Sequence, residues 1–536
     1  MSEIYDVAII GGGHNGLTAA AYLAGAGARV VVLEKNAATG GAASTEEFAP
    51  GFRNSVASYT VSLLNPKVIR DLELHKHGLR IVERPAGNFW PIDAATSMHL
   101  PYGSLAARQK EMARFSERDA HAYAAYDEML ERAAAVLRDL VTRTPPNAGG
   151  GLLELIKGGA IGRRVLKLSL DEQRVLLELF TASAQDFLDR WFENENIKAA
   201  FAFDGIVGAY APPSAPGTAY VLLHHCFGEV NGKKGVWGHA IGGMGAISRA
   251  MENCAKSRGA EIRTNAQVIF LRMNGERTDG VVLASGEEVR ARAVVSNIPP
   301  KLLFRAYVPE HAVSPDVRAR FTGMKTGSGV FRMNVALSEL PDFTARPGKA
   351  LAPHHASGIL VAPTMAYMEE AYWDARQHGW SRAPIVEMLI PSTLDDTLAP
   401  PGQHVASLFV QYVAPQLPRP RSWQDPAEKK ALSDLVIETV ARHAPNFKQA
   451  VIARQELSPL DLEQRFGLID GDIFQGQLGL GQLFSARPVL GAANYRMPVP
   501  GLYLCGSGAH PGGGVTGVPG MNAAREIAKD LKLRRI

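Results

Sequence analysis

The 536-residue sequence predicts an α/β protein in which a discontinuous domain with a parallel sheet is joined to a second domain of sheet and helices. Three observations predict this class. A strand, a glycine loop, a helix and a second strand follow one another between residues 5 and 34. A segment rich in Ala, Leu, Glu and Arg interrupts the α/β pattern after residue 105, and a second glycine-rich loop precedes a helix after residue 501.

The N-terminal motif has the order that a dinucleotide-binding unit requires. The apolar run Tyr5–Ile10 predicts a buried parallel strand. Gly11, Gly13 and Gly16 follow it in the spacing G-x-G-x-x-G, which allows a tight turn, a close diphosphate and close helix packing. Glu34 ends the next strand, in place to bind the ribose hydroxyls of an adenosine. The motif therefore predicts a Rossmann-like domain that binds a dinucleotide.

A pair of glycines indicates which dinucleotide is bound. Gly40 and Gly41 follow Glu34 by six residues, where a loop turning back along the diphosphate would need them. NAD-dependent dehydrogenases have no such requirement, so the pair favours FAD.

Two helical stretches separate the parts of this domain. Residues 105–140 and 152–192 have helical spacing and are divided by Pro145-Pro146 and a run of three glycines. Their apolar faces are either core or a lid over a lipid-like substrate. Residues 235–300 then return to the nucleotide domain, with the strand around Val268 passing the adenine.

The C-terminal segment is the second strong signal. A strand ends at Gly506, a glycine-rich loop follows, and a helix begins at Val518. The start of a helix directed at the pyrimidine end of a flavin would stabilise the anionic reduced ring.

Composition excludes several classes of protein. Lys and Arg total 57 against 53 Asp and Glu, without a basic run, so nucleic-acid binding is not expected. Cys226, Cys254 and Cys505 are far apart, which excludes a disulfide framework and a CxxC redox centre. The adjacent His224 and His225 point to different sides of any regular element, so no metal site is predicted with Cys226 and Glu229.

Taken together, residues 6–34, Gly40-Gly41, 51–55, 237–245 and 502–522 resemble the phytoene-dehydrogenase-related flavoproteins. The similarity is to the branch of pyridine nucleotide-disulphide oxidoreductase domain-containing proteins, beside the carotenoid desaturases. The resemblance implies an α/β fold like that of amine oxidases and GDP-dissociation inhibitors. That fold has a discontinuous Rossmann-like FAD-binding domain and a sheet-plus-helix substrate domain.

The resemblance also implies domain boundaries and cofactor contacts. The FAD-binding domain would comprise residues 1–104, 231–300 and 490–536, and the substrate-binding domain residues 105–230 and 301–489. Non-covalent FAD would be held by Gly11, Gly13, Asn15, Gly16, Glu34, Lys35, Gly40, Gly41, Ala42, Ser58, Tyr59, Val268, Gly506, Val518, Pro519 and Met521.

The activity implied is hydride transfer from a C–H bond of a lipophilic, polyene-like or isoprenoid-like substrate to flavin N5. Dehydrogenation, desaturation and isomerisation stay open, with oxygen or a quinone as electron acceptor. The alternatives are a flavin amine oxidase and a non-catalytic binding protein like the GDP-dissociation inhibitors.

Few side chains are required for such chemistry, because hydride transfer depends on orientation more than on a base. His510, in the C-terminal loop, is the one candidate for a catalytic residue, and a loop-organising hydrogen bond is the alternative. Tyr59, Trp237 and Phe474 are candidates for apolar walls of the site, or for core.

The N-terminus lacks a basic region before an apolar segment, and no run of about 18 apolar residues suggests a membrane span. A cytoplasmic location is expected. Peripheral contact of the helical segment with a membrane, and oligomerisation, stay open.

Overall fold

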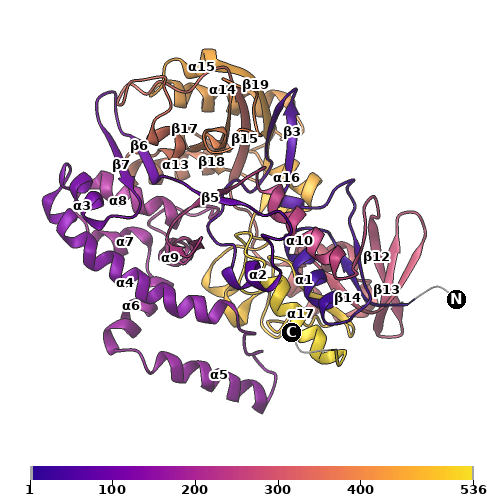
Figure 1. Ribbon diagram of the computed structural model, residues 1–536. Helices are drawn as coiled ribbons and strands as arrows, with labels where there is room; N and C mark the ends of the chain where they lie inside the picture. The colour runs from indigo at the N-terminus through magenta and orange to yellow at the C-terminus, as the bar shows by residue number, and fades with distance from the viewer. Residues whose placement is uncertain (1–3, 534–536) are drawn as a thin grey trace.

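Two seven-stranded sheets organise the chain, and Figure 1 shows them in separate parts of the molecule. The computed structural model describes residues 4–533. The first three residues, which belong to the N-terminal region where no basic segment was found, lie outside the described residues. The mixed α/β class predicted from the sequence is confirmed.

The first sheet is the predicted nucleotide-binding sheet. Its order is β11 (Glu261–Arg263), β2 (Val30–Leu33), β1 (Tyr5–Ile10), β14 (Glu288–Ser296), β13 (Arg277–Leu283) and β12 (Val268–Asn274), with β20 (Leu502–Leu504) also paired to β14. The pairs among β11, β2, β1, β14 and β20 are parallel, whereas β12, β13 and β14 are antiparallel. Parallel strands need crossover helices, and three helices cover this sheet: α1 (His14–Gly25), α10 (Gly245–Ser257) and α17 (Val518–Asp530).

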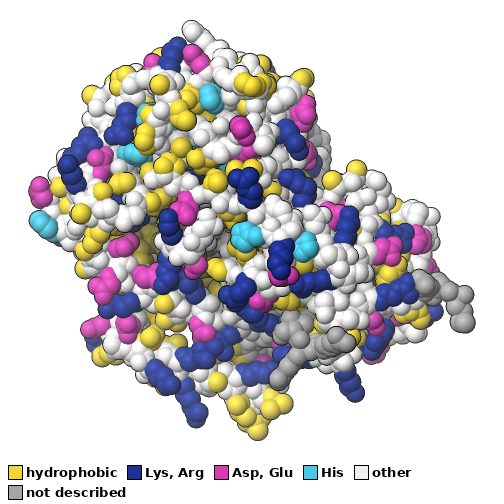
Figure 2. Space-filling view, viewed as in Figure 1, with side chains coloured by type: hydrophobic (Ala, Val, Ile, Leu, Met, Phe, Trp, Pro, Cys, Tyr) yellow, Lys and Arg dark blue, Asp and Glu magenta, His cyan; other side chains and the backbone are white. Residues whose placement is uncertain are grey.

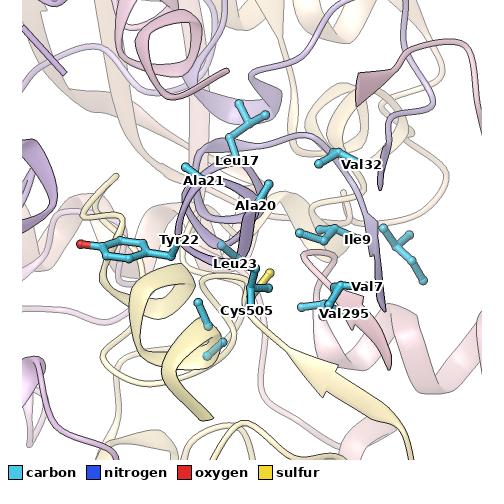
Figure 3. Packing of buried hydrophobic residues seen from close by; sticks show 14 of the residues in the cluster. Val7, Ile9, Leu17, Ala20, Ala21, Tyr22, Leu23, Val32, Val295 and Cys505 are labelled. Atoms are coloured by element: carbon cyan, nitrogen blue, oxygen red, sulfur yellow. The ribbon is translucent and has the colours of Figure 1, made fainter. Parts of the chain in front are cut away.

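Apolar side chains of α1 and of the strands form the core of this domain, as Figure 3 shows. Ile9 of β1 lies opposite Val32 of β2 and Val295 of β14, and all three are fully buried or nearly so. Burial of such a side chain contributes about 1.5–3 kcal/mol. Because the central strands are covered on both faces, their sequences are continuous runs of β-branched residues and do not alternate between apolar and polar residues.

Two glycines permit helices and loop to meet at the edge of this core. A Cβ on Gly16 would lie 2.4 Å from the Gly11 carbonyl oxygen, so only glycine fits there. A Cβ on Gly520 would lie 2.2 Å from the carbonyl oxygen of Asn15, so α17 packs directly on the first turn of α1. The N-terminal and C-terminal helices therefore begin side by side.

The second sheet lies mainly in the part of the chain that was predicted to bind substrate. Its order is β19 (Val451–Leu457), β15 (Val330–Leu337), β18 (His404–Val413), β17 (Trp380–Leu389), β16 (Gly358–Val361), β6 (Ala86–Pro91) and β7 (Ser97–Pro101). Only β16 and β6 pair in parallel within it. The helices α13 (Met365–His378) and α14 (Pro426–Ala441) pack against β17.

A block of helices lies beside both sheets (Figure 1). Its members are α3 (Leu105–Ala113), α4 (Glu117–Val141), α5 (Leu152–Val165), α6 (Leu170–Thr181), α7 (Ala184–Asp189), α8 (Glu195–Ala202) and α9 (Thr218–Cys226). The predicted helix over 105–140 is divided at Ser116, whose side chain accepts a hydrogen bond from the Asp119 amide and caps α4.

Short elements connect these layers. They are β3 (Thr45–Ala49), β4 (Phe52–Ser55), α2 (Pro66–Asp71), β5 (Ile81–Glu83), β8 (Glu229–Val230), β9 (Lys233–Lys234), β10 (Gly238–Ala240), α11 (Pro300–Leu302), α12 (Pro315–Thr322), α15 (Phe447–Ala450) and α16 (Pro459–Phe466).

One boundary differs from the sequence prediction. Residues 1–104 were assigned to the nucleotide-binding domain, yet β6 and β7 within that range extend the second sheet through pairing with β16. The physical reason is that Phe89 of β6 joins the apolar core of the second sheet. Such a long-range pairing leaves no local signal in the sequence.

The contact between α1 and α17 makes a prediction about stability. Gly520→Ala is expected to lower the free energy of unfolding by about 1–3 kcal/mol, because the added methyl group overlaps the Asn15 carbonyl. Urea denaturation followed by circular dichroism measures the change. The control is Gly159→Ala in α5, where no atom lies within 4 Å and alanine favours the helix. Equal midpoints for the two variants would contradict the prediction.

Candidate functional site

A cavity opens at the carboxyl ends of β1, β2 and β14, where Ile10, Leu33 and Asn297 contribute to its wall. Ligands of open α/β sheets bind at this edge of the sheet. The predicted cofactor residues that line it are Gly11, Gly13, Asn15, Glu34, Lys35, Gly41, Ala42, Ser58, Tyr59 and Val268. Segments far apart in the sequence thus meet at one site.

The glycine loop presents unused hydrogen-bonding groups to this cavity. Gly11 has a φ of 93°, and Gly13 occupies the N-cap of α1, where no side chain caps the helix and no acid lies in the first turn. Asn15 Oδ1 and His14 Nε2 are buried and have no hydrogen-bond partner among the described residues. A helix start of this kind attracts an anion, so the residues present fit the diphosphate of a dinucleotide.

Glu34 holds its predicted place at the end of β2. Its side chain is buried, with Oε2 accepting from the Gly12 amide at 2.8 Å and Oε1 accepting from the Asn36 amide at 2.9 Å. Each carboxylate oxygen has further lone pairs, which leaves acceptor capacity for ribose hydroxyls. The Glu34 carboxylate therefore holds the glycine loop through a hydrogen bond and also faces the cavity.

The paired glycines lie against the first loop. The Gly40 amide donates to the Gly12 carbonyl at 2.9 Å, and Gly40 adopts a φ of 122° that a residue with a side chain rarely adopts. Gly41 lines the cavity, whereas Gly40 and Gly16 lie behind its wall and support the backbone.

The C-terminal loop contacts the cavity through other residues than predicted. Gly506, Val518, Pro519 and Met521 do not line it; Ser507, Gly514 and Val515 do. The reason is packing, because Val518 and Met521 belong to the apolar core of the first domain. Gly506 is needed where a Cβ would lie 2.7 Å from the Asn297 carbonyl oxygen.

His510 also lies away from the cavity wall. Its Nε2 is 3.2 Å from the Leu140 carbonyl oxygen, and its own carbonyl accepts from the Tyr495 hydroxyl at 3.0 Å. Burial lowers the pKa of the ring to about 4. The structure places this histidine in the loop-organising role that was the alternative to a catalytic one.

Aromatic side chains line the end of the cavity that faces the second sheet. Tyr59, Trp237 and Phe474, named from the sequence as candidate walls, all line it together with Phe409. The indole of Trp237 stacks on the ring of His225 at 6.3 Å between centroids. A planar, apolar ring system fits between such walls.

A buried charged group stands behind Tyr59. The guanidinium of Arg332 lies 4.4 Å from the centroid of the Tyr59 ring, and the Tyr59 hydroxyl donates to Glu387. Burial lowers the pKa of Arg332 to about 10 and raises the pKa of Glu387. Arg332 also donates to the Leu408 carbonyl at 2.7 Å, so the aromatic wall is fixed to the second sheet.

Other lining residues were missed in the sequence. They include His14, Asn36, Ser62, Leu63, Gln267, Asn297, Ile298, Tyr307, Phe409, Phe466, Leu468, Ile473 and Gln475. Asn297 carried a usable signal, since it follows a parallel strand whose carboxyl end had to meet the site. Gln475 lies in a loop between α16 and β20, so no helix or strand pattern predicted that it would line the cavity.

The histidine pair lies on α9, which packs against α4 in the block of helices (Figure 1). The rings of His224 and His225 are 5.2 Å apart at 77°. Across residues 4–533, no group of three or more metal-ligating side chains comes together.

Comparison with known proteins agrees with this site. Residues 16–330 match the family of flavin containing amine oxidoreductases, so the chain belongs to that family. The resemblance found in the motifs is thereby confirmed, and the family implies a flavin cofactor and an oxidoreductase.

Individual relatives cover almost the whole chain. The chain is 41% identical to pyridine nucleotide-disulfide oxidoreductase domain-containing protein 2 of Rattus norvegicus, over 98% of this chain and 94% of the relative. Over 96% of this chain and 96% of the relative, it is 23% identical to the lycopene-forming phytoene desaturase of Pantoea ananas.

Solved structures share the fold at low sequence identity. Putrescine oxidase bound to putrescine aligns with a TM-score of 0.62 at 15% identity, over 99% of both chains. Cyclohexylamine oxidase from Brevibacterium oxydans aligns with a TM-score of 0.57 at 16% identity, over 99% of this chain and 100% of that one.

Loss of the Glu34 carboxylate is expected to reduce flavin binding. Glu34→Gln removes the charge and is expected to weaken flavin affinity about tenfold or more, since a hydrogen bond to a charged group contributes about 1.5–3 kcal/mol. The ratio of flavin to protein absorbance after dialysis measures this. Glu47→Gln, on the short strand β3 and outside the cavity wall, is the control. Equal flavin retention in both variants would count against the assigned role of Glu34.

Proposed function

We propose that this chain is an FAD-dependent oxidoreductase that binds FAD non-covalently and oxidises a C–H bond of a lipophilic substrate. The observation that carries the proposal is that two cavities lie next to each other and share part of their walls. The cofactor cavity shares Val207, His225 and Trp237 with a second cavity of about 760 Å³. A cofactor and a substrate can therefore meet at this junction.

The fit to FAD rests on the order of groups along the first cavity. Glu34 suits the adenosine ribose, the start of α1 suits the diphosphate, and the aromatic end suits a flat ring. Bound FAD would supply the hydride acceptor. The side chains of this protein would hold the reacting carbon against the ring and exclude water from it.

The second cavity supports a lipophilic substrate. Its wall is largely aromatic and aliphatic, with Trp90, Leu100, Tyr102, Leu105, Tyr123, Tyr126, Leu130, Phe201, Phe203, Val207 and Leu222 among its residues. Apolar area removed from water contributes about 25 cal/mol per Å², so a long hydrocarbon would bind there by burial alone. Dehydrogenation, desaturation and isomerisation are all compatible with this cavity.

A flavin amine oxidase is the second candidate. Tyr59, Trp237 and Phe409 surround the junction end of the cofactor cavity, and aromatic faces attract an amine nitrogen that carries positive charge. The amine oxidases that share the fold make this candidate worth a separate assay.

Non-covalent attachment is favoured by the state of the thiols. Cys254 and Cys505 are buried in the core of the first domain, and burial raises the pKa of both thiols, so neither is present as a nucleophilic thiolate. Acid precipitation of the purified protein is expected to release yellow FAD into the supernatant.

The absorption spectrum tests the proposal directly. Bands near ~370 and ~450 nm that bleach on anaerobic reduction with dithionite and return in air would establish a redox-active flavin. Slow return in air, with fast return on adding a quinone, is expected for a dehydrogenase or desaturase. Fast return in air would favour the amine oxidase. A colourless protein that FAD does not reconstitute would overturn the proposal and favour the non-catalytic binding protein.

We also propose that α5 makes peripheral contact with an anionic lipid bilayer. None of its residues is buried, and Leu152, Leu153 and Leu155 are 73–74% exposed. Figure 2 shows hydrophobic side chains with Lys and Arg beside them at the lower edge, where Figure 1 places α5.

The charge near this helix complements anionic lipid. The side chains of Arg163 and Lys167 make no ion pair among the described residues, so both are available to lipid phosphates. Exposed leucines beside free basic groups are typical of a helix that lies in the membrane interface. Of the helices described between residues 4 and 533, none is long and apolar enough to cross a bilayer.

Liposome co-sedimentation tests this contact. The full chain is expected to sediment with vesicles that contain phosphatidylserine and to remain in solution with purely zwitterionic vesicles. Replacing Leu152, Leu153 and Leu155 by Ser is expected to reduce binding at least tenfold, since each buried leucine contributes about 1.5–3 kcal/mol. Leu351→Ser, an exposed leucine outside the helical block, is the control. Wild-type protein that stays in the supernatant with both vesicle types would refute the proposal.

A further inference from the structure

We infer that Asp204 forms a polar subsite in the second cavity, which binds the hydrogen-bond-donating group, a hydroxyl or an ammonium, of an otherwise apolar substrate. This inference rests on the proposed function and deepens it, because it names a chemical feature of the substrate. No motif in the sequence pointed to this residue.

Asp204 lies where the two cavities approach each other. It belongs to the short turn Phe203–Gly205, one helical turn before Val207, which lines both cavities. Asp204 lines the second cavity and does not line the first. A ligand that reached the cofactor cavity with one end would therefore pass this carboxyl with its remaining length.

The carboxyl of Asp204 has no hydrogen-bond or ion-pair partner among the described residues. Two fully buried acids show the contrast, because the chain supplies their partners. Asp119 accepts from the amides of Glu193 and Asn194, both at 2.9 Å, and Asp472 accepts from the amides of Gly327 and Phe474 at 3.0 and 2.8 Å.

Asp204 is half-buried, and its carboxyl faces a cavity without a partner from the chain. A polar group in such a place is open to a hydrogen-bond partner that a ligand supplies. Aromatic and aliphatic side chains make up about half of the wall of this cavity, which has room for a ligand of substantial length. The wall also contains basic groups, but Lys233 pairs with Glu83 and Lys234 pairs with Glu131, and Arg108 donates to the Tyr123 hydroxyl. A ligand group that donates a hydrogen bond would satisfy the carboxyl, whereas a carboxylate would be repelled from it.

The groups that face Asp204 determine its charge. Tyr126 comes from α4, Cys226 from α9, Tyr102 follows β7, and Glu387 comes from β17. None of them is a cation.

Two basic groups lie nearby, and neither pairs with the Asp204 carboxyl, although the His225 ring hydrogen-bonds to the Asp204 backbone. Arg84 donates to the Thr60 hydroxyl and acts on Glu387, and burial lowers the pKa of the His225 ring. The His225 Nδ1 lies 2.8 Å from the Val221 carbonyl oxygen. Burial first, and then the Glu387 charge, raise the pKa of Asp204 to about 7.

The raised pKa means that this carboxyl keeps its proton more readily than an exposed aspartic acid does. A ligand ammonium would favour its ionised form, and a ligand hydroxyl can pair with either form. The two ligand types are separable by experiment for this reason.

Calorimetric titration with three probes of equal chain length tests the subsite. Octylamine, 1-octanol and octanoate share the same hydrocarbon and differ only in the end group. The wild-type protein is expected to bind the amine or the alcohol at least tenfold more tightly than octanoate at pH 7. The titrations are made with both FAD-loaded and flavin-free protein. A failure of the subsite can then be distinguished from a failure of the protein to bind FAD.

Two substitutions assign the preference to Asp204. Asp204→Leu is expected to abolish the preference, which corresponds to at least a tenfold loss for the favoured probe. Asp204→Asn keeps an acceptor but not a charge. If Asp204→Asn keeps the affinity of the wild type for the favoured probe, the natural ligand group is a hydroxyl. If that affinity is lost, the ligand group is an ammonium. Glu128→Gln, an exposed acid of α4 outside the cavity wall, is the control. Octanoate binding as tight as the other probes, or preferences that Asp204→Leu leaves intact, would overturn the inference.

A second measurement guards against a variant that fails to fold. A carboxyl whose pKa is higher in the folded than in the unfolded protein destabilises the fold increasingly as pH rises from about 4 to 7. Without ligand, Asp204→Asn is therefore expected to melt at a higher temperature than the wild type, with a larger gain at pH 8 than at pH 5. An equal gain at both pH values, or a lower melting temperature at pH 8, would show that the carboxyl is already paired.

Discussion

The approach of two backbones holds this molecule together at its functional centre. At Gly520 the chain passes so close to the Asn15 carbonyl that no side chain fits between them. This contact brings the starts of α1 and α17 to one place, although they lie at opposite ends of the sequence. The start of α1 faces the cavity, while the start of α17 packs behind it and holds it in place. The cofactor cavity, the glycine loop and the C-terminal loop all depend on this arrangement.

A second constraint comes from charge buried in the other domain. Arg332 is almost fully buried in the second sheet and supports Tyr59 through its guanidinium, while Glu387 accepts from the Tyr59 hydroxyl. Removing one member of such a group would leave another charge without compensation, which makes the aromatic wall rigid. Under the proposed function, the first sheet would position the nucleotide half of the cofactor, and the second sheet would position the aromatic wall beside the substrate.

Local motifs explain what could be predicted from the sequence. Gly11, Gly13 and Glu34 are separated by a strand, a turn and a helix of standard length, so their spacing alone brings them together. The parallel strands and the helical block could be recognised in the same way. The failures are long-range. The pairing of β6 with β16 and the position of Gln475 depend on packing between distant segments, and neither is encoded in a short pattern.

Residues with ambiguous chemistry were also beyond prediction. His510 has the residue type of a catalyst, but its surroundings give it a carbonyl partner and a buried position. Asp204 has no motif around it, and only the cavity shows that its carboxyl is unsatisfied.

The topology has a consequence for how such proteins diversify. The helical block enters after β7 and ends at α9, so it is one continuous insertion between two fixed points of the fold. It carries Asp204 and much of the wall of the large cavity, while the glycine loop, Glu34 and the C-terminal loop lie outside it. Under the proposed function, a change confined to this one segment would alter the wall of the large cavity and leave the glycine loop and Glu34 in place. The part of the fold that selects a substrate would then be separable from the part that holds the cofactor.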